Sequence, residues 1–112
     1  MITTHILDIS KGRPASGVSV TLEFLENAKL WRVIGRDTTD ADGRARNLTS
    51  ADTRLNPGVY RLTFDTAGYF IPQQIESFYP EVTVSFNVNE ATQHYHVPLL
   101  LSPFGFTTYR GS

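Results

Sequence analysis

Three histidines are the chain's candidates for proton transfer. His94 and His96 stand two residues apart near the C-terminus, and His5 stands near the N-terminus. An imidazole has a reference pKa of about 6.5, so it can take a proton from water near neutral pH. An arginine beside such a ring can stabilise the oxyanion that forms when water attacks a carbonyl group. This combination of residue types makes hydrolysis the first hypothesis.

Two other hypotheses remain open on residue types alone. The His-x-His spacing puts His94 and His96 on one face of a strand, and His5 could complete a three-histidine zinc site. No carboxylate that would support such ligands is evident from the spacing. In the other hypothesis, the chain has no catalytic group and is a carrier or adhesion module. We interpret His94, which follows a polar loop, as a partly exposed polar residue without a role in the chemistry.

The last four residues, from Tyr109 to Ser112, carry polar and charged groups directly after an apolar segment. Chain ends normally fray, so a terminus of this kind is expected to be held against the body of the protein. We interpret Arg110 as an anchor that pairs with the α-carboxylate of Ser112 or with an acidic group of a neighbouring subunit. An ordered tail would then lie close to the histidines at residues 94 and 96.

Strands are the elements that must position these groups. Apolar and polar residues alternate with a period of two in residues 18–24, 60–64 and 82–88, which is typical of strands with one buried face. Turn sequences at residues 12–17, 40–43 and 56–58 separate the strands. Residues 66–77 lack a strand pattern, and Pro72 limits any helix there to a short one.

In the C-terminal strand, alternation predicts one face with the two histidines and Leu100, and an opposite face with Tyr95, Val97, Leu99 and Leu101. Several short strands without a long helix predict an all-β fold. Its architecture is expected to be an antiparallel β-sandwich of two sheets with one short helix. A length of 112 residues fits one domain that covers residues 1–112.

Composition excludes several classes of function. Ten Lys plus Arg against eleven Asp plus Glu give a net charge of -1, which argues against nucleic acid and anionic membranes as partners. The absence of cysteine excludes disulfides, thiolate zinc sites and cysteine nucleophiles. The chain has no secretion signal at its start and no stretch near the ~20 apolar residues that span a bilayer. We therefore expect a soluble, cytoplasmic protein.

Apolar residues in the second half exceed what one small core needs. They are Phe78, Tyr79, Leu99, Leu100, Leu101 and Phe104. A net charge near zero does not oppose association, and exposed apolar surface of this size is typical of a protein–protein interface. The sequence thus predicts a symmetric homo-oligomer.

Four segments spread over nearly the whole chain carry a resemblance to a known family. They are His5-Ile-Leu-Asp8 with Gly12-Arg-Pro-Ala15, Asp42-Gly-Arg44, Glu76-Ser-Phe-Tyr-Pro-Glu81, and the block from His94 to the terminal Tyr109-Arg-Gly-Ser112. In kind and order they resemble the 5-hydroxyisourate hydrolases, the purine-catabolic members of the transthyretin-like family. The terminal Tyr-Arg-Gly-Ser is the most specific of the four.

The resemblance implies hydrolysis of 5-hydroxyisourate to 2-oxo-4-hydroxy-4-carboxy-5-ureidoimidazoline in urate degradation, with neither cofactor nor metal. It implies catalytic roles for three residues: His5 and His96 position and deprotonate water, and Arg44 stabilises the oxyanion. Tyr109 and Ser112 would bind the substrate ring, together with His5 and Arg44. It further implies a homotetramer, a dimer of dimers, with the sites in the channel between the dimers.

Transthyretin, a hormone carrier, shares this fold, so fold alone does not separate enzyme from carrier. The resemblance identifies positions that do. Transthyretin has Lys where this chain has His5, Glu where it has Arg44, and Thr where it has His96, and its chain continues past the position of Ser112. These positions match the hydrolases, and a small-ligand carrier or binding module is the alternative.

Overall fold

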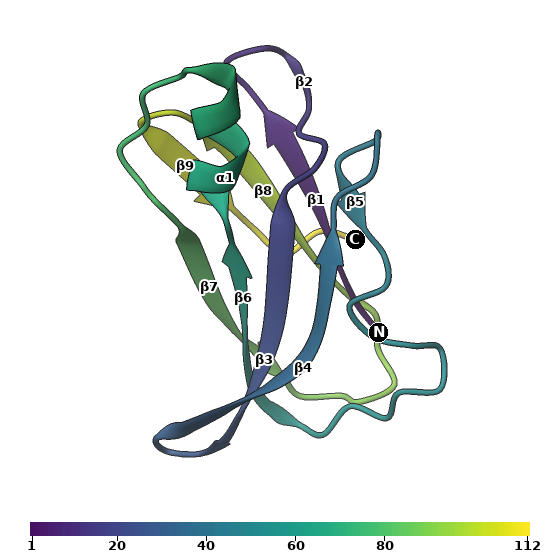
Figure 1. Ribbon diagram of the computed structural model, residues 1–112. Helices are drawn as coiled ribbons and strands as arrows, with labels where there is room; N and C mark the ends of the chain where they lie inside the picture. Colours follow the sequence, from purple (N-terminus) through teal and green to yellow (C-terminus); the bar gives the residue numbers. More distant parts are fainter.

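Two β-sheets packed face to face make up the computed structural model, which describes residues 1–112 (Figure 1). The strands are β1 (Ile2–Asp8), β2 (Arg13–Pro14), β3 (Ser19–Asn27), β4 (Leu30–Thr38), β5 (Arg44–Ala45), β6 (Gly58–Phe64), β7 (Val82–Val88), β8 (Tyr95–Ser102) and β9 (Gly105–Thr108). The helical segments are α1 (Thr66–Phe70) and the single 3₁₀ turn η1 (Ile71–Gln73). The predicted all-β sandwich with one short helix is confirmed.

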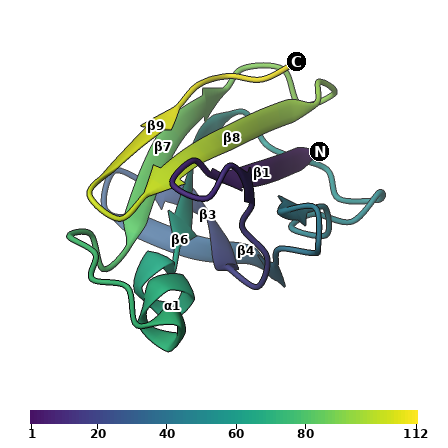
Figure 2. The same ribbon diagram turned by 90° about the horizontal axis from the view of Figure 1, so that it is seen from above.

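One sheet has the strand order β2-β1-β8-β9, and β5 pairs with β1 along the same edge as β2. The other sheet has the order β4-β3-β6-β7. Figure 2 shows the two layers, with β1, β8 and β9 in one and β3, β4 and β6 in the other. All pairs are antiparallel except β1 with β8. A parallel pair needs a long connection, and here most of the chain lies between the two strands.

The core lies between the sheets and contains 19 buried hydrophobic residues. It confirms the alternation predicted for the C-terminal strand, because Tyr95, Val97, Leu99 and Leu101 all point inward. The expectation that Leu99 and Leu101 supply surface for association is therefore wrong. Phe78 and Phe104 are 69% and 64% exposed, so these two do remain on the surface.

The short helix α1 begins after Asp65, whose Oδ1 accepts a hydrogen bond of 2.9 Å from the backbone N–H of Gly68. A side chain that accepts in this way satisfies one of the free donors of the first turn. The helix ends at Phe70, and Pro72 lies in the 3₁₀ turn that follows. The predicted effect of Pro72 on helix length is confirmed. Neither helical segment has the length and apolar character needed to cross a membrane.

Candidate functional site

The outer face of the sheet that contains β1 and β8 brings the predicted catalytic groups together. In the register of the strands, Thr3 of β1 pairs with His96 of β8, and His5 of β1 pairs with Arg44 of β5. Paired residues of adjacent strands point to the same face. Residues from the two ends of the sequence and from its middle therefore meet on three neighbouring strands.

Arg44 is positioned by the tight turn that the sequence predicts at residues 40–43. Asp40 Oδ1 accepts hydrogen bonds from the backbone N–H groups of Asp42 (2.9 Å) and Arg44 (3.0 Å). The bond from Arg44 is the main cause that holds the pKa of Asp40 below its usual value. Gly43 has a φ of 77°, and a Cβ there would overlap the carbonyl oxygen of Ile6. Glycine at this position lets the turn approach β1, which brings Arg44 next to His5.

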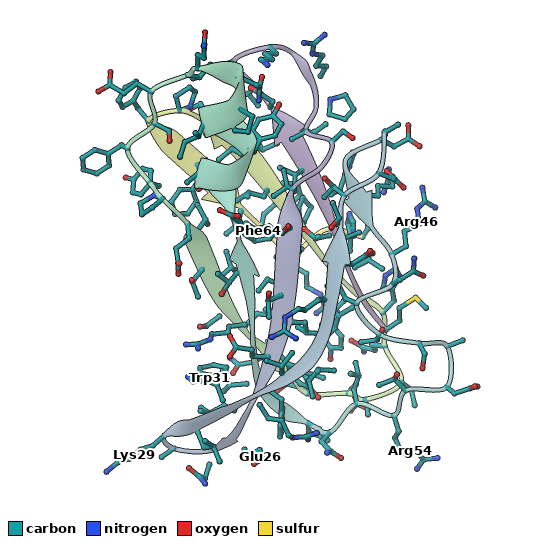
Figure 3. All side chains as sticks on the ribbon, viewed as in Figure 1. Glu26, Lys29, Trp31, Arg46, Arg54 and Phe64 are labelled. Carbon is teal, nitrogen blue, oxygen red and sulfur yellow. The ribbon has the colours of Figure 1, made fainter.

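A hollow of about 400 Å³ lies over this face. Its lining residues are Met1, Thr3, Thr4, Arg44, Arg46, His94, His96 and Ser112. Of the predicted site residues, Arg44, His96 and Ser112 thus share one hollow. His5 is not a lining residue, but it pairs with Arg44 on the neighbouring strand and is one of the groups whose charge lowers the pKa of His96. In Figure 3, Arg46 lies beside β5, whereas Trp31 and Lys29 lie at the far end of the β3–β4 hairpin.

The C-terminal tail lies against β8, as predicted. The backbone N–H of Gly111 donates a 2.8 Å hydrogen bond to the carbonyl oxygen of His96. Figures 1 and 2 place the C-terminus on the same side of the molecule as the N-terminus. Arg110 contacts Gln93 and Tyr95 within the chain: Nη2 donates to Gln93 Oε1 (3.0 Å), and the guanidinium lies 4.7 Å from the centroid of the Tyr95 ring.

Tyr109 lies on the other side of the tail. It lines a separate hollow of about 130 Å³, formed by Val84, Phe86, Asn87, Tyr95, His96, Val97, Thr108, Tyr109 and Arg110. The side chain is 55% exposed. His96 belongs to both hollows, so it is the residue that links Tyr109 to the rest of the predicted site.

The electrostatics of the larger hollow favour a neutral imidazole next to fixed positive charge. Burial lowers the pKa of His96, and the charges of Arg44, His94 and His5 act in the same direction. Arg44 and Arg46 line the hollow and supply fixed positive charge, and Met1 and Ser112 also line it. Such a site can hold electron-rich oxygens while a neutral ring accepts a proton.

Sequence reasoning did not select five residues of this hollow, among them Thr3, His94 and Arg46. His94 is exposed, in agreement with its interpretation as a polar surface residue, yet it lines the hollow beside His96. The spacing of two residues between His94 and His96 could have predicted that both lie on the same face of the strand. Thr3 had no such pattern, because its place depends on the pairing of β1 with β8.

No group of three or more His, Cys, Asp or Glu side chains is arranged to hold a metal ion, so the geometry does not support the zinc hypothesis.

Comparison with known proteins gives a family match over almost the whole chain. Residues 2–111 match the model of the HIUase/Transthyretin family. A probable 5-hydroxyisourate hydrolase from Caenorhabditis elegans is 50% identical over 111 residues, which cover 99% of this chain and 81% of that protein.

Solved structures agree with the fold. The 5-hydroxyisourate hydrolase of Klebsiella pneumoniae superposes with a TM-score of 0.84 at 36% identity and covers 99% of this chain and 98% of its own. Sea bream transthyretin, solved in complex with thyroxine, gives a TM-score of 0.90 at 35% identity over 98% of this chain and 93% of its own. Enzyme and carrier structures are thus both similar to this one, and the side chains of the hollow must distinguish them.

Proposed function

The chain belongs to the HIUase/Transthyretin family and is a hydrolase, and we propose that it opens the six-membered ring of 5-hydroxyisourate. The observation that carries this proposal is the meeting of His96, Arg44 and the terminal Ser112 in one hollow. A half-buried imidazole with a lowered pKa, next to a guanidinium, suits hydrolysis of a cyclic amide. A carrier has no need of this combination.

In the proposed reaction, His96 is the general base. Its ring takes a proton from water, and the water oxygen forms a bond to a carbonyl carbon of the ring amide. Arg44 stabilises the negative charge on the carbonyl oxygen of the tetrahedral intermediate. The C–N bond of the ring then breaks, and the proton is returned to the leaving nitrogen, which gives 2-oxo-4-hydroxy-4-carboxy-5-ureidoimidazoline.

The other predicted site residues position water and substrate. His5, paired with Arg44 on the neighbouring strand, orients the attacking water together with His96. Ser112 binds the substrate ring from the tail through its hydroxyl and backbone groups. Tyr109 contacts the ring from the side of His96 that faces the smaller hollow. This arrangement supplies orientation, which lowers the entropic cost of the attack.

The proposed biological setting is urate degradation, and the proposed assembly is a homotetramer made of two dimers. Residues 1–112 act as one domain in this proposal. The exposed side chains of Phe78 and Phe104 supply apolar surface for association. The sites would then lie in the channel between the dimers.

Addition of the protein is expected to accelerate the loss of freshly generated 5-hydroxyisourate well beyond its spontaneous decay. Absorbance spectroscopy follows both rates in the same cuvette. The proposed mechanism uses no metal, so treatment with a chelator followed by dialysis should leave the rate unchanged. A decay rate that does not depend on protein concentration would contradict hydrolysis and favour the carrier hypothesis. Loss of activity after chelation would instead support the hypothesis of a zinc site.

Gly111→Ala is expected to lower kcat/KM while the melting temperature changes little. A Cβ at this position would lie 2.7 Å from Cδ2 of His96 and 3.1 Å from Cγ of Pro98. The tail must then move away from His96 and carry Ser112 with it. Gly105→Ala is the matched control, because its Cβ meets an atom no closer than 3.7 Å. Equal activity of the two variants would show that the position of the tail does not matter for turnover.

A further inference from the structure

One hydroxyl group lies between two of the three imidazole rings. Thr3 Oγ1 is 2.7 Å from Nε2 of His94 and 2.8 Å from Nδ1 of His96. The centroids of the two rings are 6.2 Å apart, so the rings do not touch and the hydroxyl bridges them. Neither the proposed hydrolysis nor the predicted site assigns a role to Thr3 or His94.

The chemistry of a hydroxyl makes this contact directional. Threonine has one O–H proton, so it can donate to one ring and must accept from the other. The protonation of the two rings is therefore linked through Thr3. If His96 is to keep Nε2 free for water, its proton must be on Nδ1 and must be donated to Oγ1 of Thr3. The hydroxyl then donates to Nε2 of His94.

We propose that Thr3 is a positioning residue that relays a proton from His96 to His94 during hydrolysis. The proposal rests on the proposed function of the hollow. When Nε2 of His96 takes a proton from water, the proton on its Nδ1 passes to Oγ1 of Thr3, and the hydroxyl proton of Thr3 passes to Nε2 of His94. His96 and Thr3 end neutral, and His94 ends as the cation. The same steps in reverse return the proton to the leaving ring nitrogen.

Solvent exposure explains why the charge should end on His94. His96 is half-buried, and the positive charges of Arg44 and His5 oppose a cation on its ring. His94 is exposed, so water can solvate a positive charge there. The relay thus moves charge from a site that disfavours it to one that tolerates it.

The fold holds Thr3 in the geometry that a relay needs. Thr3 is buried, and its strand pairs it directly with His96. The neighbouring Thr4 has the same side chain but points to the core, where its hydroxyl donates to the carbonyl oxygen of Val97. The contact with two imidazoles is therefore a property of the position of Thr3 and is not shared by the adjacent threonine.

The kinetic test compares Thr3→Val, which removes the hydroxyl at nearly constant volume, with Thr3→Ser, which keeps it. Thr3→Val is expected to lower kcat about 10- to 100-fold with little change in KM, below the loss expected for a group that itself accepts the proton. Thr3→Ser should restore most of the rate. The matched control is Thr66→Val, which removes another buried hydroxyl, the one that donates to the carbonyl oxygen of Tyr79. This control should lower the melting temperature and leave kcat unchanged.

A double-mutant cycle tests whether His94 is the group that receives the proton from Thr3. His94→Gln should reduce kcat in the wild-type background and have no further effect in the Thr3→Val background, because the relay is already broken. ¹⁵N NMR of the imidazoles gives a readout that does not depend on turnover. Near pH 7 both rings should carry their proton on Nδ1, and Thr3→Val should abolish this preference in His96.

The outcomes separate the relay from the proposed function. An active wild-type protein in which Thr3→Val has the same kcat as Thr66→Val would overturn the relay and leave the hydrolase intact. A proton on Nε2 of His96 in the wild-type protein would also overturn it. Failure of the wild-type protein to accelerate the loss of 5-hydroxyisourate would overturn the proposed function itself, and the relay with it.

Discussion

Arg44→Glu is expected to lower kcat/KM about 10⁴-fold, and Arg44→Ala only about 10²- to 10³-fold, the usual loss when one group that stabilises an oxyanion is removed. Alanine removes the positive charge that faces the tetrahedral intermediate. Glutamate also puts a negative charge where negative charge develops, so the two unfavourable effects add. The order of the variants is therefore a test of the electrostatic role, since a purely structural side chain would not distinguish the sign of the charge.

Lys29→Glu is the matched control for this charge reversal. Lys29 lies at the far end of the β3–β4 hairpin, away from the hollow (Figure 3). The substitution changes the net charge by the same amount as Arg44→Glu, and kcat/KM should stay at the wild-type value. Steady-state kinetics with freshly generated 5-hydroxyisourate gives the ratios, and circular dichroism checks that each variant folds. Wild-type activity in both Arg44 variants would remove this residue from the site.

The strands could be predicted because each has a local pattern. Residues 82–88 alternate apolar and polar side chains and form β7 with the same bounds, and the turn at residues 40–43 has its Asp and Gly in the places that the backbone requires. The Leu run was harder to interpret. Three consecutive leucines look like surplus apolar surface, but the pleat of β8 turns Leu99 and Leu101 into the core. The alternation of side chains along the strand decides which leucines are buried. Leu99 and Leu101 share the inward face with Tyr95 and Val97.

The candidate site could be predicted in residue types but not in its connections. The histidines and Arg44 can be selected because few side chains do such chemistry. The contact of Thr3 with two rings depends on the parallel pairing of β1 with β8, two strands that are separated by most of the chain. No local pattern encodes that register. The same holds for the bond between Arg110 and Gln93. The sequence analysis expected Arg110 to pair with the carboxylate of Ser112 or with an acidic group of a neighbouring subunit.

His96→Gln is expected to lower kcat/KM by about 10²- to 10⁴-fold, the range for loss of a group that takes or gives a proton in the transition state. Glutamine keeps a polar side chain of similar length but cannot act as a base near neutral pH. The backbone carbonyl that accepts from Gly111 is unchanged by this substitution. The tail should therefore remain in place, and the melting temperature should change little.

The pH profile identifies the base. A general base must be neutral, and burial together with the charges of Arg44, His94 and His5 lowers the pKa of His96. The neutral ring therefore persists to lower pH than in free histidine, so kcat/KM of the wild-type protein should rise through a midpoint below the reference value of about 6.5. His96→Gln should abolish this rise. If the variant kept the same inflection at reduced rate, another group, with His5 as the first candidate, would be the base, and His96 would serve only to position the water.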